Sequence, residues 1–334
     1  MCTPIRVADR LVEWIMLELA GGKLGKVREF ANTAQGHQAL LKVLMEAKVE
    51  RICLEATGTY HLDLALALDS AGLALMVLNP KAAKRFAEAL LTRNKTDGVD
   101  AGVLAQYAER MPFTAWQRPA DEAVTLRAVA RQLAALRKTR TSERNRLHAM
   151  RQSALTPAVV IESVEQSIAQ CDTQIDALRA WARAHIQDHR ALHEAFELLI
   201  SATGIGETSA IELLGELLVL PEDMAAKQWV AMAGLDPRQI SSGTSVNKQP
   251  RLSKAGNRYL RQALYMPALS AARHDPHIRA FYLHLIEQRG LKKIQAVCAV
   301  MRKLLHGIHA MLKHQRPFDA ARLCPPRPTP ASAA

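Results

Sequence analysis

The segment of residues 121–193 contains no glycine and carries apolar residues at helical spacing. Leu126, Val129 and Leu133 recur at intervals of three and four, which places them on one face of a helix. Pro157 is poorly accommodated inside a helix, so we expect it to separate two long helices. The pair is predicted to form an antiparallel hairpin or a coiled coil with another subunit. The segment therefore divides the chain into a region before it and a region after it.

The first of these helices is strongly basic. Residues 127–151 contain eight lysines and arginines against one acidic residue, Glu143. A solvated surface is the ordinary explanation of a charge run, and it stays open here. So large an imbalance over about seven turns favours a nucleic-acid-binding face. The residues predicted for this face are Arg127, Arg131, Arg137, Lys138, Arg140 and Arg144.

The charge of the whole chain favours the same class of partner. Its 334 residues include 44 Lys and Arg against 32 Asp and Glu, a net charge of +12, which suits nucleic acid first and an acidic membrane surface second. The N-terminus lacks the pattern of a signal peptide, and the apolar stretch 62–78 is too short and too charged to span a bilayer. Five scattered cysteines argue against a disulfide framework and suit a reducing cytoplasm.

Residues 1–118 are predicted to form an α/β domain that ends near Pro112, Trp116 and Pro119. The expected strands are 11–19, 26–30, 51–54 and 74–78, and the expected helices are 36–47, 60–70, 81–91 and 99–109. An antiparallel start followed by strand–helix–strand units fits a ribonuclease H-like sheet.

Acidic residues stand at two informative places in this domain. Glu55 directly follows the apolar strand Ile52–Leu54, where an unpartnered carboxylate is costly to bury. Asp97 and Asp100 are three apart at a predicted helix start, so both carboxylates share one face. Helix capping is the alternative explanation of this pair. Converging carboxylate oxygens in a basic protein predict Mg²⁺ held against phosphate.

Residues 195–321 are predicted to be helical, with a loop at 234–253. Gly204 and Gly206 resemble the turn of a helix–hairpin–helix, whose backbone N–H groups approach a phosphate; a plain tight turn is equally open. In the loop, Ser242 precedes a glycine amid cations, which suits an exposed nucleophile or an ordinary turn. The neighbouring cations expected to contact phosphates are Lys248, Arg251, Lys254, Arg258 and Arg261. Residues 322–334 are predicted to be a disordered tail.

The chain resembles the DEDD transposases of insertion sequence family one-ten, the bridge-RNA-guided recombinases of bacteria. The likeness extends over about residues 5–320. It is carried, in order, by Glu55-Ala-Thr-Gly-Thr-Tyr60, Asn79-Pro80, Asn94-Lys-Thr-Asp97-Gly-Val-Asp100-Ala, Gly204-Ile-Gly206, Ala233-Gly-Leu-Asp-Pro237, Ser242-Gly243 and Leu252-Ser-Lys-Ala-Gly256.

This resemblance implies a RuvC-like catalytic domain (1–118), coiled-coil helices (119–194) and a helical transposase domain (195–321). It implies the DEDD carboxylates Asp9, Glu55, Asp97 and Asp100, which would bind Mg²⁺, and the catalytic serine Ser242. It further implies a homotetramer, a dimer of dimers, in which a structured guide (bridge) RNA pairs with both donor and target DNA. The expected location is the bacterial cytoplasm, at the nucleoid.

The first carboxylate departs from the family pattern. The family presents Gly-Ile-Asp there, whereas this chain has Val7-Ala8-Asp9. Asp9 is assigned by its distance from Phe30-Ala-Asn-Thr33, and Glu13 and Glu18 are the alternatives. Two other functions stay open from the residues alone: a RuvC-like nuclease that hydrolyses DNA junctions without a serine intermediate, and a non-catalytic nucleic-acid-binding protein.

Overall fold

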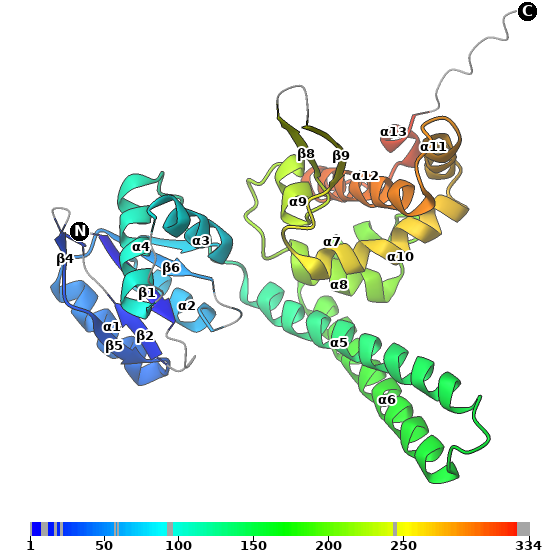
Figure 1. Ribbon diagram of the computed structural model, residues 1–334, viewed down its shortest axis with the longest axis horizontal. Helices are drawn as coiled ribbons and strands as arrows, with labels where there is room; N and C mark the ends of the chain where they lie inside the picture. The colour runs from blue at the N-terminus through cyan, green and yellow to red at the C-terminus, as the bar shows by residue number, and fades with distance from the viewer. Residues whose placement is uncertain are drawn as a thin grey trace, which may run out of the picture. The chain divides into compact units, whose positions relative to one another are not determined.

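The computed structural model describes residues 2–7, 13–16, 19–20, 23–56, 58, 60–91, 96–242 and 246–325. Within these, side chains are described for 25–56, 58, 60–91, 96–239 and 251–325. The chain forms two compact units, Met1–Arg118 and Pro119–Ala334 (Figure 1). Among the described residues, no helix has the length and apolarity needed to cross a membrane.

The first unit is a mixed sheet with helices on both faces. Its elements are β1 (Cys2–Val7), β2 (Glu13–Met16), β3 (Leu19–Ala20), β4 (Lys23–Leu24), β5 (Arg28–Ala31), α1 (Ala34–Glu46), β6 (Arg51–Glu55), α2 (Leu62–Ser70), β7 (Leu75–Leu78), α3 (Pro80–Ala89) and α4 (Asp97–Arg110).

The sheet has the strand order β5-β2-β1-β6-β7. β2 is antiparallel to β1 and β5 to β2, whereas β6 is parallel to β1 and β7 to β6. The short strands β3 and β4 extend it beside β1. The expected antiparallel start and parallel strand–helix–strand units are thereby confirmed. The central strand β1 is missing from the predicted strands, because a proline such as Pro4 normally argues against a central strand.

Strand β6 is buried on both faces. Ile52 and Leu54 pack with α1 and α2 in one core, while Cys53 packs with α3 and α4 in the other. All three side chains are fully buried. Because side chains alternate along a strand, Glu55 falls on the same face as Cys53, the face that α4 covers. The burial of both faces of β6 therefore determines that Glu55 lies on the face covered by α3 and α4.

The second unit is mainly helical. Its elements are α5 (Asp121–Met150), α6 (Ala158–Asp188), α7 (Arg190–Ile200), α8 (Glu207–Leu217), α9 (Ala226–Met232), β8 (Pro237–Ser242), β9 (Val246–Leu252), α10 (Arg258–His274), α11 (Pro276–Glu287), α12 (Lys293–His314) and α13 (Ala320–Leu323). One apolar core runs from Leu126 on α5 to Cys324 after α13, so the long helices share their core with the C-terminal helices.

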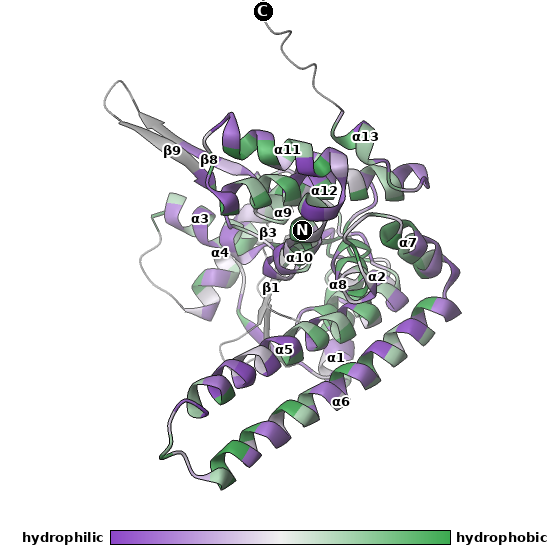
Figure 2. Cartoon of the chain, turned by 90° about the vertical axis from the view of Figure 1, so that its right-hand side faces the viewer, coloured by the Kyte–Doolittle hydropathy of each residue, from purple (hydrophilic) through white to green (hydrophobic). Residues whose placement is uncertain are grey.

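Helices α5 and α6 form an antiparallel hairpin, as one of the two sequence interpretations predicts (Figure 1). Its register follows from three contacts. Arg140 Nη1 lies 2.6 Å from Asp172 Oδ1, Arg151 pairs with Glu165 near the connecting turn, and His185 Nε2 lies 3.0 Å from the carbonyl oxygen of Glu122 at the other end. Hydrophilic residues recur along both helices in Figure 2, and the buried residues are those facing the shared core.

Two sequence predictions for the second unit are wrong. The loop predicted at 234–253 is largely the pair of antiparallel strands β8 and β9, in which Pro237 pairs with Leu252 and Ser242 with Val246. The disordered tail predicted from Arg322 starts too early, because Arg322 and Leu323 complete α13. Cys324 is also buried, against the core. Residues 326–334 lie outside the described residues.

The turn between α7 and α8 depends on a glycine. Gly204 has φ 94°, a left-handed conformation that favours glycine. A Cβ at this position would lie 2.6 Å from the carbonyl oxygen of Pro267 and 2.8 Å from the amide of Ala271, both on α10. Gly206, the N-cap of α8, has open space where its Cβ would be. The two glycines of the predicted phosphate-binding turn thus differ in how much the fold needs them: packing against α10 requires glycine at position 204, whereas position 206 has room for a side chain.

We predict that Gly204→Ala destabilises the protein by about 2 kcal/mol or more, because strain at positive φ adds to overpacking against α10. Gly206→Ala is the matched control and is expected to cost less than about 1 kcal/mol. Urea unfolding followed by circular dichroism measures both. Equal stability of the two variants would contradict the packing role of Gly204.

Candidate functional site

Three candidate carboxylates lie in the first unit, one at the end of β6 and two at the start of α4. Glu55 ends β6 and is half-buried. Asp97 and Asp100 occupy the first turn of α4, which packs against β1 and β6. The N-cap of α4 is Thr96, whose hydroxyl accepts a hydrogen bond from the amide of Val99 at 3.3 Å. The helix therefore has its side-chain cap without using either aspartate.

The segment that follows Glu55 is tied to β5 by a short polar chain. Asn32 Nδ2 donates to the carbonyl oxygen of Tyr60 over 3.3 Å, and the ring Nε2 of His37 lies 2.7 Å from Asn32 Oδ1. His37 is buried, and this burial lowers the pKa of its imidazole, a shift that Asp63 opposes. These contacts fix the chain on the carboxyl side of Glu55. Sequence reasoning did not single out His37, a lone histidine in an amphipathic helix.

The donor set of these acids fits a hard cation. Carboxylate oxygens are the ligands that Mg²⁺ prefers, and each of the three residues supplies two. Asp9, the fourth predicted carboxylate, lies outside the described residues, and so does Glu18, one of its two alternatives. For Glu13, the other alternative, the structure describes only the backbone, which is part of β2. The described part of the chain contains no group of three His, Cys, Asp or Glu gathered closely enough to hold a metal. The predicted metal site thus stays a prediction that needs Asp9.

Ser242 lies in the second unit, as the last residue of β8. Its backbone pairs with Val246, the first residue of β9. The side chain of Ser242 and Gly243 lie outside what the structure describes, as does the side chain of Lys248. The candidate nucleophile thus stands at the far end of a two-stranded arm (Figure 1).

The base of this arm is held by short contacts. Ser253 Oγ donates to Asp236 Oδ1 over 2.5 Å, and the Ser253 amide donates to the Asp236 carbonyl oxygen over 2.9 Å. The amide of Asn257 donates to the carbonyl oxygen of Met232 over 2.7 Å. Gly256 has φ 132°, and a Cβ there would collide with the Met232 carbonyl. Both strands of the arm therefore leave from one tightly packed crossing.

The predicted cations near the arm have different surroundings. Arg251, Lys254 and Arg258 are exposed. Arg261 is half-buried, and its Nη1 donates to the carbonyl oxygen of Ala233 over 2.9 Å, which ties α10 to the start of the arm. Arg258 lies over the ring of Tyr259, 4.9 Å from its centroid. Three cations thus remain available to phosphates, while the fourth has a structural contact.

Most of the predicted basic face of α5 is engaged within the second unit. Arg131 donates to Glu216 twice, over 2.6 and 3.0 Å, and this hydrogen bonding raises the pKa of its guanidinium. Arg137 lies 2.6 Å from Glu212. Arg140 and Arg144 both reach one acid, Asp172 on α6. 

Two residues of this face differ from the rest. Burial lowers the pKa of Arg127, with a smaller contribution from the positive charge of Arg131. Lys138 is exposed and forms no ion pair with a described acidic residue. The imbalance along α5 is therefore offset by acids on α6 and α8, and Lys138 is the exposed member of the predicted face that pairs with none of the described acids.

Sequence reasoning missed two buried acids of the second unit, Glu212 and Glu216, which pair with the arginines of α5. They are 5 % and 2 % exposed, and burial raises the pKa of the Glu212 carboxyl against the opposing effect of Arg137. Glu216 also accepts a hydrogen bond from Asn257 Nδ2 over 2.6 Å, and Asn257 Oδ1 caps α10. A signal existed: both acids stand in an apolar helical run, Ala210-Ile-Glu-Leu-Leu-Gly-Glu-Leu217, where a buried charge needs a partner.

Two family models match this chain. A DEDD transposase model of IS110 elements, described as "Transposase", matches residues 7–154. A second model, described as "Transposase IS116/IS110/IS902 family", matches residues 196–283. Glu55, Asp97 and Asp100 fall within the first match and Ser242 within the second.

Similar proteins agree with these matches. The chain is 31 % identical over 299 residues to the pilin gene-inverting protein of Moraxella bovis, covering 87 % of this chain and 89 % of that protein. It is 33 % identical over 277 residues to the pilin gene-inverting protein of Moraxella lacunata, covering 80 % and 81 %. An uncharacterized 43.6 kDa protein of insertion element IS110 from Streptomyces coelicolor is 29 % identical over 158 residues, which cover 46 % of this chain and 37 % of that protein.

The engaged and unengaged cations of α5 should behave differently when replaced. We predict that Arg131→Gln lowers the free energy of unfolding by about 3 kcal/mol, because it leaves Glu216 buried without its cation. Lys138→Gln is the matched control on the same helix and should change stability by less than about 0.5 kcal/mol. Because Lys138 is predicted to contact a phosphate, the Lys138→Gln substitution should also reduce the slope of log affinity for DNA against log salt concentration by about one. An Arg131→Gln protein of unchanged stability would refute the structural role.

Proposed function

The chain belongs to the IS110 family of transposases, with a DEDD domain at residues 7–154, and we propose that it recombines DNA through a covalent phosphoserine–DNA intermediate at Ser242. The observation that carries this proposal is the presence on one chain of two chemically complementary groups. One is the carboxylate set of Glu55, Asp97 and Asp100, and the other is a serine at the end of an anchored arm.

In this mechanism Asp9, Glu55, Asp97 and Asp100 would hold Mg²⁺ in a RuvC-like, ribonuclease H-like domain. The strand order β5-β2-β1-β6-β7, antiparallel then parallel, supports that fold. The bound cation would stabilise negative charge on the scissile phosphate during the exchange of its oxygens. The task of the protein's own residues is to place the carboxylates: Glu55 by the end of β6, and the two aspartates by the first turn of α4.

Ser242 supplies the nucleophile. Its hydroxyl oxygen forms a bond to phosphorus while a deoxyribose oxygen leaves and becomes a free hydroxyl. The DNA end stays attached to the protein until a hydroxyl of another strand displaces the serine. Each step exchanges one phosphodiester for another, so no ATP is consumed. The carboxylates and the serine belong to different units, and we propose that they meet within one subunit or between neighbours of a tetramer.

The partners follow from the same proposal. Donor and target DNA are the substrates, and a structured guide RNA pairs with both and selects the sites. The protein then needs to hold backbones more than read bases, which suits its net charge of +12 and its low aromatic content of 4 %. The Moraxella relatives are named for pilin gene inversion, a reaction that also cuts and rejoins strands. Such a protein works at the nucleoid, in the bacterial cytoplasm.

The covalent intermediate is tested with two adjacent serines. We predict that Ser242→Ala abolishes the protein–DNA adduct on denaturing gels, while binding of DNA and RNA persists. Ser241→Ala is the matched control and should still form the adduct. Adduct formation by Ser242→Ala would remove this serine from the mechanism. Nicked but never rejoined DNA, with no adduct in the wild type, would instead indicate a RuvC-like hydrolytic nuclease.

The carboxylates are tested by isosteric neutralisation. Glu55→Gln and Asp97→Asn are each expected to reduce Mg²⁺-dependent strand exchange by at least about 10²-fold, because each removes a cation ligand. Glu46→Gln, at the exposed end of α1, is the control and should leave the rate unchanged. Rates are measured across a Mg²⁺ titration with the cleaved and rejoined products resolved on a gel. Wild-type rates in either ligand variant would refute the proposed metal site.

A further inference from the structure

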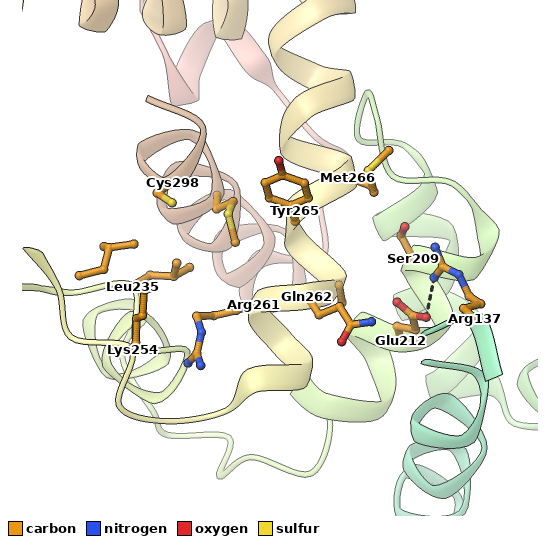
Figure 3. A pocket seen from close by; sticks show the side chains of 13 residues that line it. Arg137, Ser209, Glu212, Leu235, Lys254, Arg261, Gln262, Tyr265, Met266 and Cys298 are labelled. Carbon is orange, nitrogen blue, oxygen red and sulfur yellow. Dashed lines mark hydrogen bonds and ion pairs between the residues drawn. The ribbon is translucent and has the colours of Figure 1, made fainter. Parts of the chain in front are cut away.

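The second unit contains a pocket that the proposed mechanism does not use. Its volume is about 430 Å³, and it lies against α10, between α5 and α8 on one side and α12 on the other (Figure 3). That volume lies within the range of sites for small ligands. Its lining is mostly apolar and includes Leu235, Leu252 and Met301. Leu235 lies two residues before the start of β8 and Leu252 is the last residue of β9, so the pocket adjoins the base of the arm that carries Ser242.

The charges of the pocket favour an anion. Its lining contains Arg137, Lys254 and Arg261 against one carboxylate, Glu212. Arg137 is paired with Glu212, and Arg261 donates to the carbonyl oxygen of Ala233. Lys254 is exposed and forms no ion pair with a described acidic residue. Lys254 is therefore the cation in this pocket that a bound phosphate can use.

The backbone holds this lysine in a costly conformation. Lys254 has φ 51°, in the left-handed region, which costs a residue with a side chain roughly 1–2 kcal/mol relative to the right-handed one. Its amide donates to the carbonyl oxygen of Gly234 over 3.1 Å, inside the packed crossing at the base of the arm. Glycine would adopt the same conformation without this cost. The strained backbone thus fixes the direction in which this side chain leaves the chain, as is often found for residues with a binding role.

The mouth of the pocket carries apolar and amide groups that suit a nucleobase. Tyr265 and Met266 on α10 are 38 % and 57 % exposed, although both are large apolar side chains. Figure 3 shows Gln262 on the same helix, on the side of the Glu212–Arg137 pair. An aromatic ring stacks on a base of any identity, and an amide both donates to and accepts from a base edge.

We propose that this pocket binds one unstacked nucleotide from a single-stranded segment of the nucleic acid next to the β8–β9 arm. Lys254 contacts its phosphate, Tyr265 and Met266 contact the face of its base, and Gln262 contacts the base edge. The inference rests on the proposed function only in assuming a nucleic-acid substrate. Holding one nucleotide beside the base of the arm sets where the strand passes relative to Ser242. The nucleotide can come from DNA or from RNA, and the experiment separates the two.

The test compares base-containing and abasic single strands of equal length and charge, as DNA and as RNA, bound to the full-length protein. We expect the wild type to bind the base-containing strand at least about fivefold more tightly, the effect of one stacked base. Tyr265→Ala should remove this preference, Tyr265→Phe should retain it, and Trp181→Ala, which removes a 44 % exposed ring from α6, should also retain it. Thermal unfolding confirms that the variants fold.

Cys298 reports on the pocket itself. It lines the cavity, and burial raises the pKa of its thiol, an effect that Lys254 opposes. We expect the base-containing strand, and not the abasic one, to slow the labelling of Cys298 by a maleimide at alkaline pH. The Cys298→Ser variant shows how much of the total labelling belongs to Cys298. The strand type that protects, DNA or RNA, identifies the source of the nucleotide.

Equal affinity for both strands, or a base preference that survives Tyr265→Ala, would overturn the proposal. So would a bound base-containing strand that leaves the labelling of Cys298 unchanged. These outcomes are independent of the adduct at Ser242. A protein that forms the adduct and shows no base preference refutes the pocket alone, whereas a base preference without any adduct refutes the serine mechanism alone.

Discussion

The second unit depends on one buried carboxylate. Glu216 on α8 is 2 % exposed, and it accepts hydrogen bonds from Arg131 on α5 and from Asn257 at the start of α10. A buried charge of this kind is tolerated only when its hydrogen bonds are complete, and removing one partner leaves a costly group in an apolar core. The same interaction therefore joins three helices and aligns the N-cap of α10. Arg131 also lies 4.7 Å from the centroid of the Tyr259 ring, which Arg258 approaches as well, so the charge network continues to the surface.

The first unit depends on a different constraint, the burial of β6 on both faces. Ile52, Cys53 and Leu54 leave the strand no freedom to shift by one residue, because a shift would exchange the two cores. Glu55 consequently has a defined face and a defined helix opposite it. The side-chain cap of α4 comes from Thr96, so the aspartates in its first turn are not needed to satisfy that helix end.

Sequence reasoning predicted most elements of the fold and failed where tertiary contacts decide. The helices of the first unit, the two long helices α5 and α6 and the strands β6 and β7 follow from hydrophobic periodicity, which is a local signal, whereas residues 195–321 were predicted to be helical without individual helix bounds. Strand β1 and the β8–β9 hairpin do not, because Pro4 and the polar residues 247–251 mask their pairing. The charges of α5 were interpreted from that helix alone, whereas their partners Glu212, Glu216 and Asp172 are distant in sequence. Candidate site residues could be named from motifs, yet only packing distinguishes Arg131 from Lys138 or Gly204 from Gly206.

The crossing beneath the β8–β9 arm has a mechanical consequence. From Pro237 to Ser242 the strand advances five residues, or about 17 Å at about 3.3 Å per residue. A tilt of about 10° at the foot of such a lever displaces its tip by about 3 Å, a distance comparable to the whole separation between reacting atoms in a productive encounter. The contacts among residues 232–236 and 253–257 limit how far the arm can tilt, and they thereby limit how far Ser242 can move. Loosening a single contact there would spread Ser242, the proposed nucleophile, over a region wider than that separation, even though no residue near Ser242 had changed.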